Sequence, residues 1–332
     1  MKQYCISVQI NCWVFLFPLY IFKPVKIYFN QMENTPVAVI LKKACEKGVV
    51  IPGFNIPYLP MMEPVARALN DTGTFGLIMV ARLEWIKFQS GSMKMIRDEY
   101  EKLKDLRYMR LHLDHVPVID EDNLLTDFEN IISEAIDLGY DSVMVDGSRL
   151  SLEDNIRNTR KIVELAHRKE IPVEAELGAV MGHESGPLPP YEELFASGKG
   201  FTSPVEAKKF VRETGTDWLS VAIGNVHGAI SQAARKEKKI EARLDITQLQ
   251  KIEDAAGVPL VLHGGTGISK AYLMQSFKNG IAKINIATAI RQPFERVMDV
   301  SVKAAQEAVY DEMTDLLVNQ LEISGSASKI LD

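Results

Sequence analysis

The chain has too few cysteines for a disulfide framework and too few basic residues for a polyanion-binding surface. Its three cysteines, Cys5, Cys12 and Cys45, are odd in number and crowded into the first 45 of 332 residues, so we expect a reducing compartment, namely the cytoplasm. Lys and Arg together number 38 against 44 for Asp and Glu, which gives a net charge of −6. This balance argues against nucleic-acid and membrane partners and leaves small-molecule chemistry as the expectation.

Long uninterrupted hydrophobic runs are also lacking, and the nearest approach to one lies in residues 1–31, which contain no Asp or Glu. Its apolar stretch from Cys12 to Phe22 is interrupted by Pro18 and is shorter than the roughly 20 apolar residues of a membrane span. No small-residue cleavage site of a signal peptide follows it. We interpret residues 1–31 as an atypical extension, either a translated upstream stretch before a start near Met32 or an appendage, and residues 32–332 as one domain.

From residue 34 onward, short β-rich apolar runs alternate with longer helical patterns, as in parallel strands joined by crossover helices. The eight runs are Val49–Asn55, Phe75–Ala81, Met109–Asp114, Ser142–Asp146, Pro172–Glu176, Trp218–Ile223, Pro259–His263 and Ala282–Ile286. Eight strand-and-helix units over about 300 residues predict an α/β fold, the (β/α)8 or TIM barrel. An open doubly wound sheet is the alternative, but no Gly-rich nucleotide loop follows the first run.

Two stretches depart from this alternation. Residues 178–203 are rich in Gly, Pro and Ser, and a loop of that length in a compact domain is usually a functional lid or disordered. Residues 291–321 form one long helical pattern, broken at most once, which we expect to pack on the barrel or on a neighbouring subunit.

Polar residues gather at the carboxyl ends of the predicted strands, where the active sites of such barrels lie. His115, His227 and His263 follow three different strands in a chain with only six histidines. Three histidines at one barrel mouth would form a catalytic zinc site with an open fourth position, and Glu176 is a candidate additional or alternative ligand. Any one of these histidines taken alone is better explained as a buried side chain bonded to a backbone carbonyl, and only the convergence of three favours the metal site.

Asp114 directly precedes His115 in the sequence LHLDH, so we expect a carboxylate beside the metal. A carboxylate next to a Lewis acid can move a proton close to a polarised carbonyl group. This pair predicts chemistry on a ketone or an enediolate, and the alternative is an aspartate that only caps a turn.

A candidate phosphate site follows the last two predicted strands, in HGGTGIS at 263–269 and NIAT at 285–288. Loops at these two positions lead into helix N-termini and commonly hold a phosphate in such barrels. The candidate contacts are Gly264, Gly265, Thr266, Gly267 and Thr288. A tight strand-to-helix turn explains the glycines equally well, but the neighbouring His263 favours the phosphate site.

Together these stretches resemble the class II, metal-dependent ketose-bisphosphate aldolases over nearly the whole chain, from about Val37 to Ile330. The matching stretches are GFNIPYLP, LHLDH, MVDGSRLSLEDNIRNTRKIVELAH, VEAELG, FVRETGTDWLSVAIGNVHGAI, LVLHGGTGI, AKINIATAIRQPF and GSASKI. The resemblance implies reversible aldol cleavage of a phosphorylated ketose to dihydroxyacetone phosphate and an aldehyde. It also implies one catalytic zinc ion, replaceable by another divalent metal, a monovalent cation in some members, and a homodimer or homotetramer.

The resemblance also assigns roles to individual residues. The implied zinc ligands are His115, His227 and His263, with Glu176 near the alternative metal position. Asp114 would handle the hydroxyl proton, and Glu184 in the long loop would exchange the carbon-bound proton. The implied substrate contacts are Asn55, Gly228, Gly264, Gly265, Thr266, Asn285, Thr288 and Arg291. Arg291 would bind the far phosphate of a neighbouring subunit's substrate, unless it is a solvated helix residue.

The departures from the family pattern concern the aldehyde half of the substrate. Ala287 stands where members acting on fructose bisphosphate often carry an aspartate, as in tagatose-bisphosphate and deoxygluconate-phosphate aldolases. Ala81 replaces a common serine and is followed by Arg82, and the long loop carries Met181 and Ser185 in place of Gly and an acid. The sequence therefore leaves the aldehyde open.

Two other functions stay open at this point. Lys283 has the same strand parity as Asn285 and could form a Schiff base inside the barrel. The changed loop also allows a catalytically silent protein that binds a sugar phosphate. A metal-dependent hydrolase is less favoured, because no His-x-His pair lies on the first strand.

Overall fold

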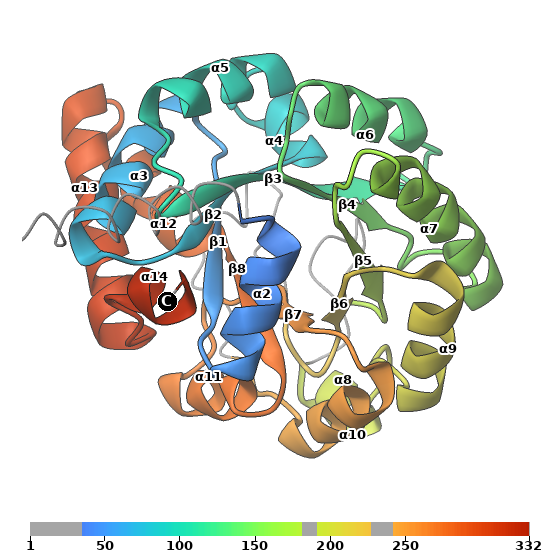
Figure 1. Ribbon diagram of the computed structural model, residues 1–332. Helices are drawn as coiled ribbons and strands as arrows, with labels where there is room; N and C mark the ends of the chain where they lie inside the picture. The colour runs from blue at the N-terminus through green and yellow to red at the C-terminus, as the bar shows by residue number, and fades with distance from the viewer. Residues whose placement is uncertain (1–34, 181–190, 227–241, 332) are drawn as a thin grey trace, which may run out of the picture. The chain divides into compact units, whose positions relative to one another are not determined.

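The computed structural model describes residues 35–180, 191–226 and 242–331, and the chain from Thr35 onward forms one compact unit. Within these ranges, parallel strands β1 to β8 close into a barrel in sequence order (Figure 1). The strands are β1 (Ile51–Asn55), β2 (Gly76–Ala81), β3 (Met109–Pro117), β4 (Ser142–Asp146), β5 (Val173–Leu177), β6 (Trp218–Val221), β7 (Leu260–Leu262) and β8 (Ile281–Ile286). The predicted (β/α)8 barrel is confirmed.

Helices surround the barrel, and in the described residues none is long and apolar enough to cross a membrane (Figure 1). They are α2 (Val37–Glu46), α3 (Met62–Thr72), α4 (Arg82–Lys87), α5 (Met93–Leu103), α6 (Phe128–Asp137), α7 (Leu152–His167), α8 (Tyr191–Ser197), α9 (Pro204–Thr214), α10 (Ile246–Ala256), α11 (Lys270–Phe277), α12 (Thr288–Val297), α13 (Val302–Asp315) and α14 (Ser326–Leu331). A 3-10 turn, η1 (Leu59–Met61), precedes α3, and a π-helical turn, η2 (Leu316–Gln320), follows α13.

All eight predicted strands are present, and their ends differ by a few residues. The prediction ended the third strand at Asp114, but β3 continues to Pro117 because a bulge lets its last residues pair with β4. The seventh was predicted to include His263, but β7 ends at Leu262. Its pairing with β8 shifts register between Leu260 and Val261.

Helices follow the strands as the alternating sequence pattern predicts, and some of them begin at a capping hydroxyl group. Ser151 caps α7 by accepting from the backbone N–H of Asp154. The long C-terminal pattern is broken once, between α12 and α13, and Ser301 caps the second helix. The loop predicted over 178–203 is not wholly irregular, because it contains α8, and its residues 181–190 lie outside the described ranges.

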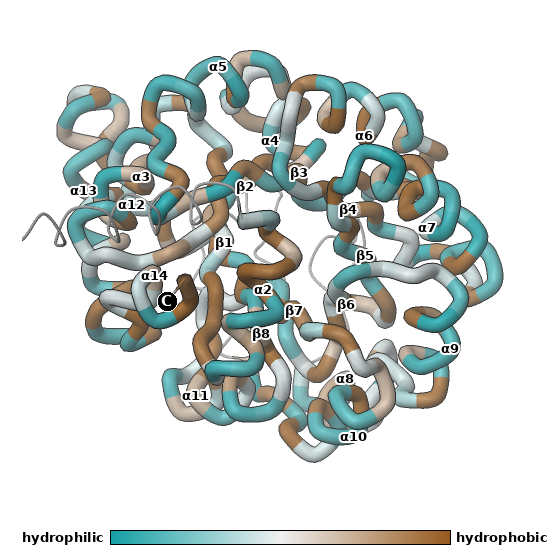
Figure 2. Tube along the Cα trace, in the orientation of Figure 1, coloured by the Kyte–Doolittle hydropathy of each residue, from teal (hydrophilic) through white to brown (hydrophobic). Residues whose placement is uncertain are grey.

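The barrel interior is polar near the ends of its strands. Side chains two residues apart on a strand share a face, so each of β3, β5 and β8 sends a pair inward. The pairs are His112 and Asp114, Glu174 and Glu176, and Lys283 and Asn285, all at most 6% exposed. In Figure 2 the outer turns of the helices are mostly hydrophilic, and hydrophobic residues lie between helices and strands. The inward pairs of β3, β5 and β8 therefore place buried polar groups at the barrel mouth and in the layer beneath it.

Candidate active site at the barrel mouth

Asp114 and His115 come from a bulge near the end of β3. β3 pairs with β4 first through Leu113 and then through Val116, whose partners Val143 and Val145 are only two residues apart, so β3 holds one residue more. His115 has φ of +31°, which residues with a Cβ rarely adopt. Neighbours on an unbroken strand point to opposite faces, and the bulge allows both of these side chains to reach the barrel mouth.

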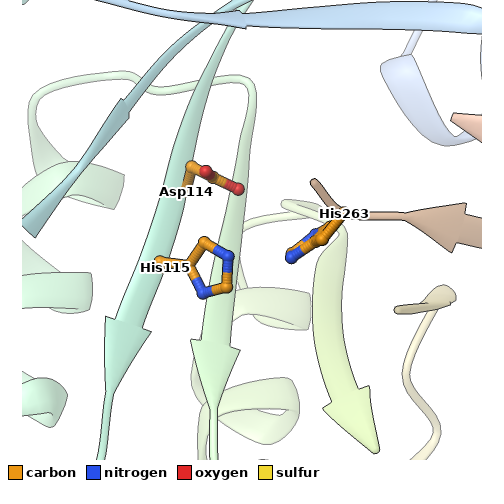
Figure 3. Close-up of side chains that lie close together, drawn as sticks. All are labelled: Asp114, His115 and His263. Carbon is orange, nitrogen blue, oxygen red and sulfur yellow. The ribbon is translucent and has the colours of Figure 1, made fainter. Parts of the chain in front are cut away.

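His263 approaches the same point from the residue after β7. Its ring centroid lies 4.4 Å from that of His115, with the two rings inclined at 69°. One ligand atom from each of Asp114, His115 and His263 lies within 4.8 Å of the others. Figure 3 shows the three side chains converging from β3 and from the end of β7. Three residues that are predicted to act together are thus brought together.

Two buried glutamates hold the His263 ring. Nε2 of His263 lies 2.8 Å from Oε1 of Glu174, and Nδ1 lies 3.1 Å from Oε2 of Glu176. Burial and the charge on His115 lower the pKa of His263, but the two carboxylates outweigh them and raise it. The imidazole therefore lies in a strongly negative setting, which would equally favour a bound cation.

Asp146 holds the His115 ring from the other side. Its Oδ2 lies 3.2 Å from Nδ1 of His115, and its Oδ1 accepts from the backbone N–H and the hydroxyl of Ser148 at 3.0 and 2.6 Å. Burial alone would lower the pKa of His115, but Asp114, Asp146 and Glu176 raise it to about 10. A carboxylate on the far ring nitrogen is the usual partner that orients a metal-binding histidine.

Two amides orient the carboxylate of Asp114. Asn285 Nδ2 donates to Oδ1 and Asn55 Nδ2 donates to Oδ2, both at 2.9 Å, and Asp114 is 1% exposed. Burial opposes ionisation, but His115 and Lys283 lower the pKa of Asp114 below its ordinary value. Asp114 is thus an ionised acceptor whose direction is set by residues of β1 and β8.

The Gly-rich loop after β7 lies directly on β8 and on the start of α12. Gly265 N–H donates to the carbonyl of Asn285 at 3.0 Å, and a Cβ at Gly265 would come within 2.7 Å of the Ile284 side chain. Thr266 Oγ1 accepts from the backbone N–H of Ala289 at 3.2 Å, in the first turn of α12. Glycine suits this close approach, and the loop and the N-terminus of α12 form one corner.

Comparison with known proteins identifies the family. Residues 35–329 match the family model described as "Fructose-bisphosphate aldolase class-II". The chain belongs to this family. It is therefore an aldehyde-lyase whose reaction is metal-dependent aldol cleavage.

Individual aldolases resemble the chain over most of their length. It is 32% identical to the fructose-bisphosphate aldolase of Streptococcus pneumoniae (strain TIGR4) over 278 residues, which cover 82% of this chain and 85% of that protein. It is 32% identical to the enzyme of the same name from Staphylococcus aureus (strain Mu50) over 252 residues, 75% of this chain and 79% of the other. The crystal structure of the YdjI aldolase from Escherichia coli K12 superposes with a TM-score of 0.68 at 28% identity, covering 88% of this chain and 98% of that one.

The donors described at the mouth of this aldolase fit the zinc that class II enzymes generally require. Zinc is bound by imidazole nitrogens and carboxylate oxygens, usually four in number. His115 and His263 supply two imidazoles within reach of Asp114, and Glu176 is close to both rings. His227, the third expected imidazole, lies outside the described residues, as do Gly228 and Glu184.

Sequence reasoning missed the ionic layer beneath the site of this aldolase. Glu174 Oε2 accepts from Lys283 Nζ at 2.7 Å and from Trp218 Nε1 at 2.6 Å. Although burial opposes ionisation, Lys283 keeps the pKa of Glu174 well below its ordinary value. His112, buried in the same layer, bonds Ser142 through Nδ1 at 2.8 Å. Lys283 lies two residues before Asn285 on β8, and Glu174 lies two residues before Glu176 on β5. Strand parity therefore predicts that both side chains point into the barrel, and it could have indicated their pairing.

A second missed residue is Glu84, a buried acid in α4. Its Oε2 accepts from the backbone N–H of Ala81 at 2.7 Å. Burial raises the pKa of Glu84 to about 8, and the charge of Asp114 acts in the same direction. No sequence pattern marks this residue, because a glutamate in the first turn of a helix is ordinarily a solvated residue.

The interpretation of Arg291 as a solvated helix residue is wrong. The residue is 4% exposed, and its guanidinium forms an ion pair with Glu295 one helical turn along α12. The guanidinium carbon also lies 5.5 Å from the ring centroid of Phe88. Burial of the aliphatic stem with the charge paired is the usual way to accommodate an arginine here.

Proposed function

We propose that this aldolase reversibly cleaves a phosphorylated ketose to dihydroxyacetone phosphate and an aldehyde, using a zinc ion held by His115, His227 and His263. The observation that carries the proposal is the convergence of Asp114, His115 and His263 at the barrel mouth. The names of the relatives point to fructose bisphosphate as one candidate ketose, and Glu176 is proposed as the additional or alternative ligand.

Asp114 is proposed as the base of the cleavage step. When bound, the zinc ion would polarise the ketose carbonyl and stabilise the negative charge that develops as the carbon–carbon bond breaks. Asp114, ionised and aimed by Asn55 and Asn285, accepts the proton of the hydroxyl group at the bond that breaks. Glu184 then gives a proton to the carbon atom whose bond to the aldehyde has broken, which completes dihydroxyacetone phosphate. In the reverse direction each residue carries its proton the other way.

The ketose-end phosphate is proposed to bind Gly228, Gly264, Gly265, Thr266 and Thr288. Support comes from the corner that the 264–267 loop forms with the first turn of α12. Asn55 and Asn285 are proposed to contact the substrate as well as Asp114. The far-phosphate role of Arg291 stays a prediction, and its ion pair with Glu295 would have to open for it.

The two alternatives from the sequence are less well supported. A Schiff-base lysine needs an amine lone pair to attack the ketone, whereas Lys283 is fully buried and paired with Glu174. A silent binding protein would have no need for the oriented Asp114.

Exchange of the carbon-bound proton of dihydroxyacetone phosphate in heavy water, followed by NMR, tests the proposal without a choice of aldehyde. We expect exchange by the purified protein, its loss with a chelator, and its recovery on addition of zinc. Absence of exchange in protein that demonstrably holds zinc would contradict the proposed donor, and exchange that survives chelation would favour the lysine mechanism.

We also propose that residues 32–332 act as one domain in a cytoplasmic homodimer or homotetramer. The low cysteine count and the family resemblance support these points. Light scattering after gel filtration measures the oligomeric state directly.

A further inference from the structure

A cavity of about 240 Å³ adjoins the proposed metal site and contains two arginines that the mechanism does not use. His115, Asp146 and Glu176 of the candidate site belong to its lining, as do Arg82 and Arg149. The cavity is therefore lined both by residues of the proposed reacting centre and by two arginines.

The strand register places these arginines on the two sides of β3. Ala81, the last residue of β2, is level with Asp114, and Arg82 follows it immediately. On the other side, Asp146 is level with Pro117, and Arg149 lies in the turn that follows β4. Arg82 and Arg149 thus follow the two strands that flank β3, and both line the cavity that includes His115.

Both arginines are attached to the turn that leaves β3. Arg82 Nη1 lies 3.5 Å from Asp120 Oδ2, and Arg149 Nη1 donates to Asn123 Oδ1 at 3.4 Å. The turn has its own support, because Asp120 Oδ1 accepts from the backbone N–H groups of Asp122 and Leu124. The Arg82 contact is long and uses one nitrogen of a guanidinium with five N–H donors, so Arg82 keeps donors for an anion.

We propose that Arg82 and Arg149 bind an anionic group, a phosphate or a carboxylate, on the aldehyde half of the substrate and so determine aldehyde specificity. This inference rests on the proposed function. It differs from the expected far-phosphate contact, which would come from Arg291 of a neighbouring subunit, whereas Arg82 and Arg149 line the cavity of the same chain. Guanidinium groups suit both anions because their planar donors match paired oxygens.

The test is aldol synthesis from dihydroxyacetone phosphate with three aldehydes. Glyceraldehyde 3-phosphate carries a phosphate, succinic semialdehyde carries a carboxylate, and glyceraldehyde is neutral. The readout is the ratio of kcat/KM for each anionic aldehyde to that for glyceraldehyde. The variants are R82Q, R149Q and the double variant, and the control is R212Q, which changes an arginine whose side chain is 70% exposed on α9.

We expect the zinc-loaded wild-type protein to prefer at least one anionic aldehyde, which also identifies the anion. Each single variant should lower that ratio by about tenfold or more, because a charge-assisted bond contributes on this scale. The control should leave it unchanged. A wild-type preference for the neutral aldehyde, or variants that lower all three aldehydes equally, would overturn the proposal.

Failure of the proposed function gives a different result, namely no proton exchange of dihydroxyacetone phosphate by the zinc-loaded wild-type protein. Calorimetric titration with succinate and with inorganic phosphate then tests the arginines without turnover. Binding of either anion that is about tenfold weaker in the double variant than in R212Q supports the anion site. Equal affinities in the two proteins overturn it.

Discussion

The side chains of Asp114 and His115, consecutive residues of β3, reach the same ligand cluster because the strand bulges between Leu113 and Val116. A regular strand would send one of them to the outer face of the barrel. The left-handed backbone of His115 costs on the order of 1–3 kcal/mol, which the bond from its ring to Asp146 helps to offset. The bulge thus places a base directly beside a metal ligand.

Replacement of either described histidine ligand should remove zinc and activity together. For H115A and H263A we expect zinc content, measured by plasma mass spectrometry, to fall below about a tenth of the wild-type level and activity to fall by about 10³-fold or more. H227A is expected to behave alike. The control is H167A, since His167 is 42% exposed and bonds Asp217 on the outer surface. Near-full activity in zinc-free H115A would exclude the metal assignment.

Loss of the Asp114 carboxylate should separate catalysis from metal binding. D114A should lower kcat by about 10²–10⁴-fold, the usual contribution of a general base, while zinc content stays close to that of the wild type. N55A and N285A should show smaller losses, because each removes one of the two amides that aim the carboxylate. If D114A instead lost its zinc, Asp114 would be a ligand rather than a base.

Glu84 should make the stability of the fold depend on pH. Its pKa is about 8 in the folded chain against an ordinary 4.5, so only the folded state keeps the proton between these values. Its stabilising effect is therefore fully present below pH 4.5 and is lost as the pH rises toward 8, by up to ~1.4 kcal/mol per pH unit. E84Q keeps an acceptor for the Ala81 N–H, and its free energy of unfolding should lack this decrease with pH. The measurement is urea unfolding of both proteins from pH 5 to pH 8. The same change in the free energy of unfolding with pH in the two proteins would contradict the prediction.

Lys283 should prove structural rather than nucleophilic. Borohydride added with dihydroxyacetone phosphate should leave the mass of the protein unchanged, because the amine is paired with Glu174. K283M should unfold more easily by about 3–5 kcal/mol, since it leaves Glu174 buried without its cation. Detection of a reduced adduct on Lys283 by peptide mass spectrometry would revive the Schiff-base alternative.

The hydroxyl of Thr266 should stabilise the N-terminus of α12 and also bind the phosphate of the substrate. T266A loses the bond from Ala289 N–H and should reduce the free energy of unfolding by about 1 kcal/mol, as removal of a helix cap does. It should also raise the Kd for dihydroxyacetone phosphate. T266S keeps the hydroxyl and serves as the matched variant. Equal affinities of T266A and T266S for dihydroxyacetone phosphate would remove Thr266 from the phosphate site.

Much of the architecture was determined by the sequence itself. Eight apolar runs separated by helical patterns specify parallel strands with crossover helices, and their number favours a closed barrel once the first run is seen to lack a Gly-rich nucleotide loop. Local chemistry likewise explains the caps of α7 at Ser151 and of α13 at Ser301, because in each a serine hydroxyl accepts from a nearby backbone N–H group. The family stretches also marked Asp114, His115 and His263 as one site.

Only the tertiary structure decided how those residues are held. The bulge in β3 depends on pairing with β4, which no local pattern of LHLDH reveals. The pairing of Glu174 with Lys283 and the burial of Glu84 and Arg291 depend on partners far away in the chain or on neighbouring elements. Local sequence sets which elements form, whereas charge pairing and desolvation depend on the distances between elements, and these arise only when the barrel closes.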